Sequence, residues 1–146
     1  MDPVITTSYQ DNVSGTNRCQ VVILLVGDVV ILGLVTVFGF ATHGTYSTAG
    51  IRMLSTFIPL VIAWFMVAPH LGAFDLQVVK NYRNLWRPFW AMVIAAPMAA
   101  WLRGAWLNAP ILPIFVVVLG GFSALGLLFW RSTYFLIRQL KPRENG

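Results

Sequence analysis

An acidic side chain inside a long apolar run is the feature of this chain that could do chemistry. Asp28 lies eight residues into the run Gln20–Ala41 and is the only charged residue in it. A carboxyl group at that depth in a membrane is costly to insert and is by default a functional-site candidate. Three interpretations remain open: an interhelical hydrogen bond, a proton or cation site, and a contact to a ligand or pigment.

Unless the spans are offset, no basic partner is expected at the depth of this carboxyl group. Arg52 and Arg103 are expected near the outer ends of their apolar runs and Arg131 near an inner end. The carboxyl would then be protonated, or hydrogen-bonded to Ser123 or the Trp64 indole, because desolvation disfavours the charged form. The predicted inward stripe of this segment carries Asp28, Val35, Gly39 and Thr42.

A second group of polar and aromatic side chains gathers at the predicted outer end. Its members are His43, Arg52, Trp101, Arg103 and Trp106. Arginine and tryptophan at this level usually form an interfacial belt. Alternatively, two arginines beside a histidine could hold an anionic headgroup or a carboxylate. Because His43 and His70 are expected near opposite membrane faces, they cannot share a metal, and no metal site is predicted.

The elements that must position these residues are four apolar runs: Gln20–Ala41, Met53–Pro69, Pro88–Leu102 and Ile111–Trp130. Each approaches or reaches the ~20 residues that a helix needs to cross a hydrocarbon core of ~30 Å. The chain is 58% hydrophobic and only 10% charged, whereas soluble domains have ~25% charged residues. Apolar runs without period-2 alternation favour helices over barrel strands. The sequence therefore predicts an all-α, polytopic membrane protein, a four-transmembrane-helix bundle.

The polar segments around the runs predict the organisation of the chain. We expect a polar, disordered or surface-lying tail at 1–19, a membrane domain at 20–131 and a basic tail at 132–146. With four spans, both tails and the loop 70–87 share one side of the membrane. That side holds eight of the ten basic residues, so the positive-inside rule places both termini in the cytoplasm. The net charge of +5 thus reflects topology in the inner (cytoplasmic) membrane, and no nucleic-acid partner is expected.

The loop between the second and third runs has an amphipathic pattern at helical spacing of about 100° per residue. Its apolar face carries Leu71, Phe74, Val78, Tyr82 and Leu85. Its basic face carries Lys80, Arg83 and Arg87. The pattern predicts a cytoplasmic interfacial helix whose basic face, together with Arg131, meets lipid headgroups. A loop that only anchors the chain and fixes its topology is the alternative.

Small residues predict that the third and fourth helices pack closely as a hairpin. The third run carries Ala95, Ala96, Ala99 and Ala100, and the fourth carries Gly120, Gly121, Ser123, Ala124 and Gly126. Faces of this kind allow helix backbones in a membrane to approach, so that dispersion contacts hold them together.

Several short motifs resemble a known family. They are Gly27-Asp28, Phe38-Gly39, His43-Gly44, Thr56-Phe57, Pro59, Ala63-Trp64-Phe65, Leu102-Arg103, Pro113, Phe115 and Trp130-Arg131. Over about residues 22–131 the chain resembles a small four-helix prokaryotic membrane family that is catalogued only as a domain of unknown function. The third helix departs from that pattern. The resemblance implies a four-helix bundle, singles out Asp28, His43, Arg103 and Arg131, and implies no activity.

The expected function is that of a non-catalytic protein. The sequence has no GxSxG, HExxH, CxxC, phosphate-loop or paired-carboxylate pattern, so no catalytic residue is predicted. We expect an accessory subunit of a larger membrane complex, respiratory or photosynthetic, with lipids and other integral membrane proteins as partners. No cofactor is indicated beyond the open pigment contact. The alternative is a small oligomeric transporter or channel that uses Asp28 for proton or cation coupling, although transport paths usually have several polar groups.

Overall fold

Four long α-helices make up most of the described chain. The computed structural model describes residues 3–42, 49–75 and 81–140. The helices are α1 (Pro3–Thr42), α2 (Ala49–Val67), α4 (Trp86–Leu107) and α5 (Pro113–Leu140), with a short 3-10 helix, η2 (Tyr82–Asn84), before α4. Each of the four contains a segment long and apolar enough to cross a membrane. The predicted all-α, four-span architecture is confirmed.

Helix ends follow local sequence chemistry. Pro113 opens α5, a position at which the missing N–H and the fixed φ of proline cost nothing. Asn108 follows α4 with φ 48° and ψ 44°, the left-handed conformation that asparagine tolerates at a helix C-terminus. Pro59 and Pro97 lie inside α2 and α4 without ending them.

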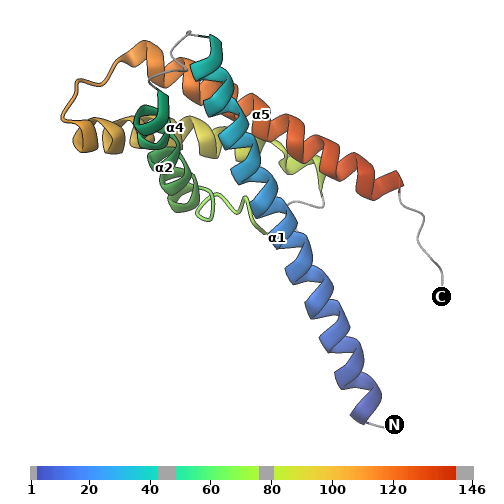
Figure 1. Cartoon of the computed structure of the whole chain (residues 1–146). Coiled ribbons are helices and arrows are strands. Elements are labelled where there is room, and N and C mark those ends of the chain that lie inside the picture. Colours follow the sequence, from blue (N-terminus) through green and yellow to red (C-terminus); the bar gives the residue numbers. More distant parts are fainter. Residues whose placement is uncertain (1–2, 43–48, 76–80, 141–146) are drawn as a thin grey trace.

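Helix α1 is longer than the predicted span. Its 40 residues extend about 60 Å at 1.5 Å per residue, roughly twice the hydrocarbon thickness. The segment 3–17, predicted as a disordered or surface-lying tail, continues this helix, and Figure 1 shows it leading away from the other helices towards the N-terminus. Adding residues to an existing helix avoids the cost of nucleation, which explains how a polar segment can remain helical.

The core lies around α2. Leu60, Ala63 and Trp64 of α2 are fully buried and pack with Leu32 of α1 and Met92 of α4. The predicted hairpin of α4 and α5 is also present, since a Cβ atom added at Gly120 would lie only 2.6 Å from the Cβ atom of Ala96. Part of the predicted small-residue face is directed elsewhere: Gly121 is exposed, and Gly126 faces Ile31 of α1.

The buried face of α1 differs from the predicted stripe. The buried residues of its described side chains are Gln20, Leu24, Asp28, Leu32 and Thr36, spaced four apart. Val35 and Gly39 are half-buried, and Thr42 is exposed. A spacing of four follows the ridge along which steeply crossing helices interdigitate, and Figure 1 shows α1 and α5 crossing. The predicted stripe has spacings of seven, four and three instead, which is the pattern of helices that run nearly parallel.

The connection from α2 to α4 differs from the predicted interfacial helix in its described part. Consecutive turns follow α2 up to Phe74, Gly72 has φ 66°, and only η2 precedes α4. Leu71 and Phe74, predicted on the membrane-facing side, pack against the core. A positive φ interrupts a right-handed helix, so the residues around Gly72 turn back towards the bundle; Val78 and Lys80 lie outside the described residues.

Candidate functional site

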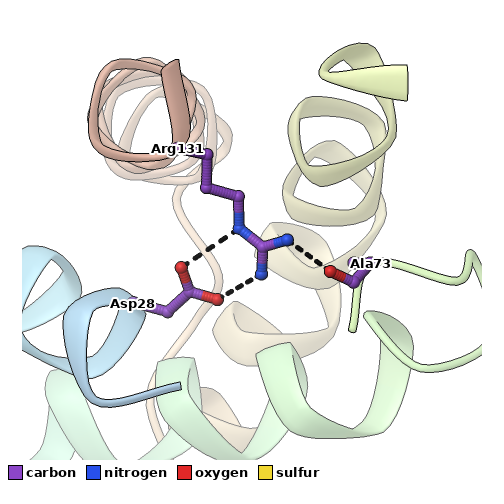
Figure 2. A network of polar contacts seen from close by, with 3 residues as sticks. All are labelled: Asp28, Ala73 and Arg131. Carbon is purple, nitrogen blue, oxygen red and sulfur yellow. Dashed lines mark hydrogen bonds and ion pairs between the residues drawn. The ribbon is translucent and has the colours of Figure 1, made fainter. Parts of the chain in front are cut away.

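A buried ion pair joins the first and last helices (Figure 2). The Nε atom of Arg131 on α5 donates to Oδ1 of Asp28 on α1 over 3.2 Å, and its Nη2 atom donates to Oδ2 over 2.5 Å. Asp28 is 0% exposed and Arg131 2%. Two parallel N–H···O bonds of this kind fix the orientation as well as the distance of the two groups.

The guanidinium has further partners from the α2–α4 connection. Its Nη1 atom donates to the carbonyl oxygen of Ala73, which the turn at Gly72 carries towards the bundle (Figure 2). Its Cζ atom lies 5.9 Å from the ring centroid of Trp64 and 5.6 Å from that of Phe74, within the range of cation–π attraction. The guanidinium of Arg131 on α5 therefore contacts α1 and the α2–α4 connection, two segments that are distant from it in sequence.

The arrangement favours a structural role for Asp28. Each charge neutralises the other, and both carboxylate oxygens accept hydrogen bonds. Removing one member of such a pair leaves an uncompensated buried charge, which is strongly destabilising. The geometry therefore favours a structural contact over the proton or cation site and over the pigment contact.

The predicted absence of a partner for Asp28 is wrong. Helix α5 continues for nine residues beyond Arg131, to Leu140, or about 14 Å, so Arg131 lies well inside this helix and not at its inner end. Arg131 is only 2% exposed and is paired with Asp28, so the predicted contact of its side chain with lipid headgroups is wrong. Of the two predicted hydrogen-bond partners, Ser123 Oγ is buried and forms no hydrogen bond with the described residues, whereas the Trp64 indole lies beside Asp28 and interacts with its carboxylate.

A close steric contact lies directly beside the ion pair. The backbone of Gly27 lies against the Trp130 indole, and a methyl group at Gly27 would overlap ring atoms of that side chain. The dipeptide Gly27-Asp28 therefore contacts the dipeptide Trp130-Arg131. Gly27 and Trp130 fit together sterically, and Asp28 and Arg131 form the ion pair. Glycine is required here because the tryptophan occupies the space of a side chain.

The outer cluster is partly formed in the described residues. The Nε atom of Arg103 donates to Oγ1 of Thr56 over 3.1 Å, and Oγ1 of Thr56 donates to the carbonyl oxygen of Arg52 over 3.0 Å. The Arg103 guanidinium also lies 5.0 Å from the ring centroid of Phe115. Trp101 and Trp106 are exposed, as expected for a membrane-interface belt. His43 lies outside the described residues.

The predicted lipid-interface residues have different environments. Arg83 is exposed. Arg87 is half-buried, donates from Nη1 to the Leu71 carbonyl oxygen over 3.3 Å, and has its Cζ atom 5.8 Å from the Trp86 ring centroid. Arg87 therefore helps to hold the turn after α2, and Lys80 lies outside the described residues.

Three parts of the site were not predicted: the Ala73 carbonyl, the Gly27–Trp130 contact and the Thr56 hydroxyl. For the Gly27–Trp130 contact a sequence signal existed. A small residue next to an intramembrane acid and a large residue next to a basic one form complementary dipeptides. No comparable signal marks a backbone carbonyl as an acceptor, because every residue carries one.

Fold and site together define a polytopic four-helix membrane bundle whose first and last helices are joined by a buried arginine–carboxylate pair. The chain belongs to the family described as "Protein of unknown function (DUF3054)", whose model matches residues 25–134. The matched segment contains both dipeptides of the site. No curated protein and no solved structure matches the chain.

Proposed function

We propose that this protein is a non-catalytic accessory subunit of a larger assembly in the cytoplasmic membrane, with both termini in the cytoplasm. The observation that carries the proposal is the closed ion pair. The side chain best suited to proton or cation chemistry, Asp28, has both oxygens bound to Arg131. What remains available for function is therefore mainly the outer surface.

That outer surface supports contacts with other integral membrane proteins. Along α4 an exposed stripe contains Trp86, Trp90, Ile94 and Trp101, spaced so that they lie along one side of a helix. Aromatic side chains contribute large contact areas and are enriched at protein interfaces. The transporter alternative needs a carboxylate that can exchange protons or cations. The carboxylate of Asp28 is instead bound to Arg131.

Site-specific photo-crosslinking tests the subunit proposal. A benzophenone amino acid is placed at Ile94 on α4 and, in a separate variant, at Phe129 on α5, both of which are exposed. Irradiation of native membranes should give a protein adduct of defined mass at one of these positions, identified by mass spectrometry after mild-detergent purification. Absorbance of the same preparation reports any pigment. Adducts with lipid alone at both positions would contradict the proposal.

Topology gives a second prediction. In a Cys19→Ala background, Asn108→Cys, between α4 and α5, should react with an impermeant maleimide added outside the cell. His70→Cys, after α2, should react only once the cytoplasmic side is opened; both native side chains are exposed. The physical reason is the excess of basic residues on the side of His70. The reverse labelling pattern would place the termini outside.

A further inference from the structure

The structure contains a cavity that the ion pair does not use. It has a volume of about 640 Å³ and lies between the C-terminal part of α1 and the other three helices, within the range of ~300–1,000 Å³ that is typical of ligand pockets. Its walls are largely apolar, with Phe38, Phe115 and Phe122 among them. Beyond Thr36 no described residue of α1 is buried, so the end of this helix leaves a space that its neighbours do not fill.

Two positive charges border this space. Arg52 and Arg103 both line it, and they are near enough to repel each other electrostatically. Of the acidic side chains that the structure describes, Asp28 is bound to Arg131, and Asp75 follows α2 at the opposite end from Arg52. An anion between the two guanidinium groups would relieve their repulsion, as arginine pairs do when they bind phosphate or carboxylate.

The guanidinium of Arg103 is held in place by contacts that occupy only one of its N–H donors. Its Nε atom donates to the hydroxyl of Thr56, a residue that is only 2% exposed, and its Cζ atom lies over Phe115. Arginine has five N–H donors, so with respect to the described residues four remain on the two terminal nitrogens for a ligand. Such a preorganised donor loses little conformational entropy on binding.

The cavity is open at the side of the bundle, between α1 and α5. Leu34 and Phe38 on α1 and Val118 and Phe122 on α5 line it and are also exposed on the outer surface. An acyl chain can therefore enter sideways between α1 and α5 while a headgroup stays at the arginines. A small soluble anion would use the charges but leave the apolar walls unfilled.

We propose that this cavity binds an anionic phospholipid, with its phosphate at Arg52 and Arg103 and one acyl chain between α1 and α5. The ligand comes from the membrane leaflet at the end of the bundle where α1 ends and α2 begins. The bound lipid would complete the packing of α1 where protein contacts are missing, independently of whether the protein is a subunit of an assembly.

Native mass spectrometry with defined lipids tests this proposal. The purified chain is mixed with dioleoylphosphatidylglycerol or with zwitterionic dioleoylphosphatidylcholine, and the bound fraction is measured. The wild-type chain should retain the anionic lipid preferentially. Arg103→Gln should weaken that binding by about tenfold, the effect of losing a charged hydrogen-bonding group. Arg138→Gln, on the exposed end of α5, is the matched control and should have no effect.

A second variant tests the acyl-chain part without changing charge. Gly39 lines the cavity, and a Cβ atom there meets nothing within 4 Å. Gly39→Leu should therefore fold normally and displace the lipid. Gly121→Leu, in open space outside the cavity, should fold equally well and leave lipid binding unchanged.

Three results of the lipid-binding measurements would overturn the proposal. They are equal retention of the two lipids, an equal loss of binding in Arg138→Gln and Arg103→Gln, or unchanged binding in both Arg103→Gln and Gly39→Leu. Inorganic phosphate added alone is the third ligand in the series. Competition by millimolar phosphate in the wild type and in Gly39→Leu alike would mean that the arginines bind a soluble anion instead.

Discussion

Replacing Asp28 with asparagine is expected to destabilise the folded bundle by about 3–5 kcal/mol, because Arg131 would keep its charge in a buried site without a counterion. The asparagine oxygen can accept one hydrogen bond, but it cannot neutralise a guanidinium. Unfolding in mixed micelles, followed by circular dichroism, measures the difference, and loss of the protein from the membrane fraction reports it in cells. Arg131→Gln is expected to cost a similar amount.

A double variant separates the charge from the shape of the pair. Asp28→Leu combined with Arg131→Met removes both charges and keeps much of the volume, and such replacements are often neutral or stabilising. The double variant should therefore be more stable than either single variant. Equal stability of Asp28→Asn and the wild type would mean that the ion pair contributes little to the stability of the bundle.

Gly27→Ala is expected to lower the free energy of unfolding by about 2 kcal/mol, since the added methyl group forces the Trp130 indole out of its position. The matched control is Gly39→Ala on the same helix, where a Cβ atom meets nothing within 4 Å. Its expected effect is neutral or stabilising by up to about 1 kcal/mol, because alanine has the higher helix propensity. The same unfolding measurement compares the two.

Steric coupling between Gly27 and Trp130 gives the stricter test of that contact. Trp130→Leu removes the ring atoms that a methyl group would overlap, so Gly27→Ala should cost much less in this background than in the wild type. A double-mutant cycle yields the coupling free energy directly. Additive effects would show that the two side chains act separately.

The sequence predicts the four spans well because each span is a local property. Any window of about 20 apolar residues must form a helix in lipid to satisfy its own backbone. This rule alone predicts that Gln20–Ala41 lies inside α1 and that all but the first two residues of Ile111–Trp130 lie inside α5. The N-terminal extension of α1 does not follow from it, because a polar segment has no hydrophobic signal by which its structure could be inferred.

The site depends on the relative depth and crossing of helices, which are non-local. The sequence singles out Asp28 and Arg131 separately, yet it places them at different levels, and it therefore predicts that Asp28→Asn assembles normally. The ion pair reverses that expectation. Likewise the sequence places Arg52 and Arg103 at the same end of the bundle. The cavity beside them, however, depends on where α1 ceases to pack against the other helices, and no single segment of the sequence determines that.

The ion pair also imposes an order on the synthesis of the chain. Asp28 and Arg131 are 103 residues apart, an interval that a ribosome takes about 5–20 s to translate. Throughout that time the counterion of the carboxyl group in the first helix has not been made. The bundle can close only when the last helix arrives, so a chain that stops before Arg131 keeps an unsatisfied acid in its first helix. Quality-control proteases that recognise intramembrane polar groups would thereby distinguish incomplete chains from finished ones.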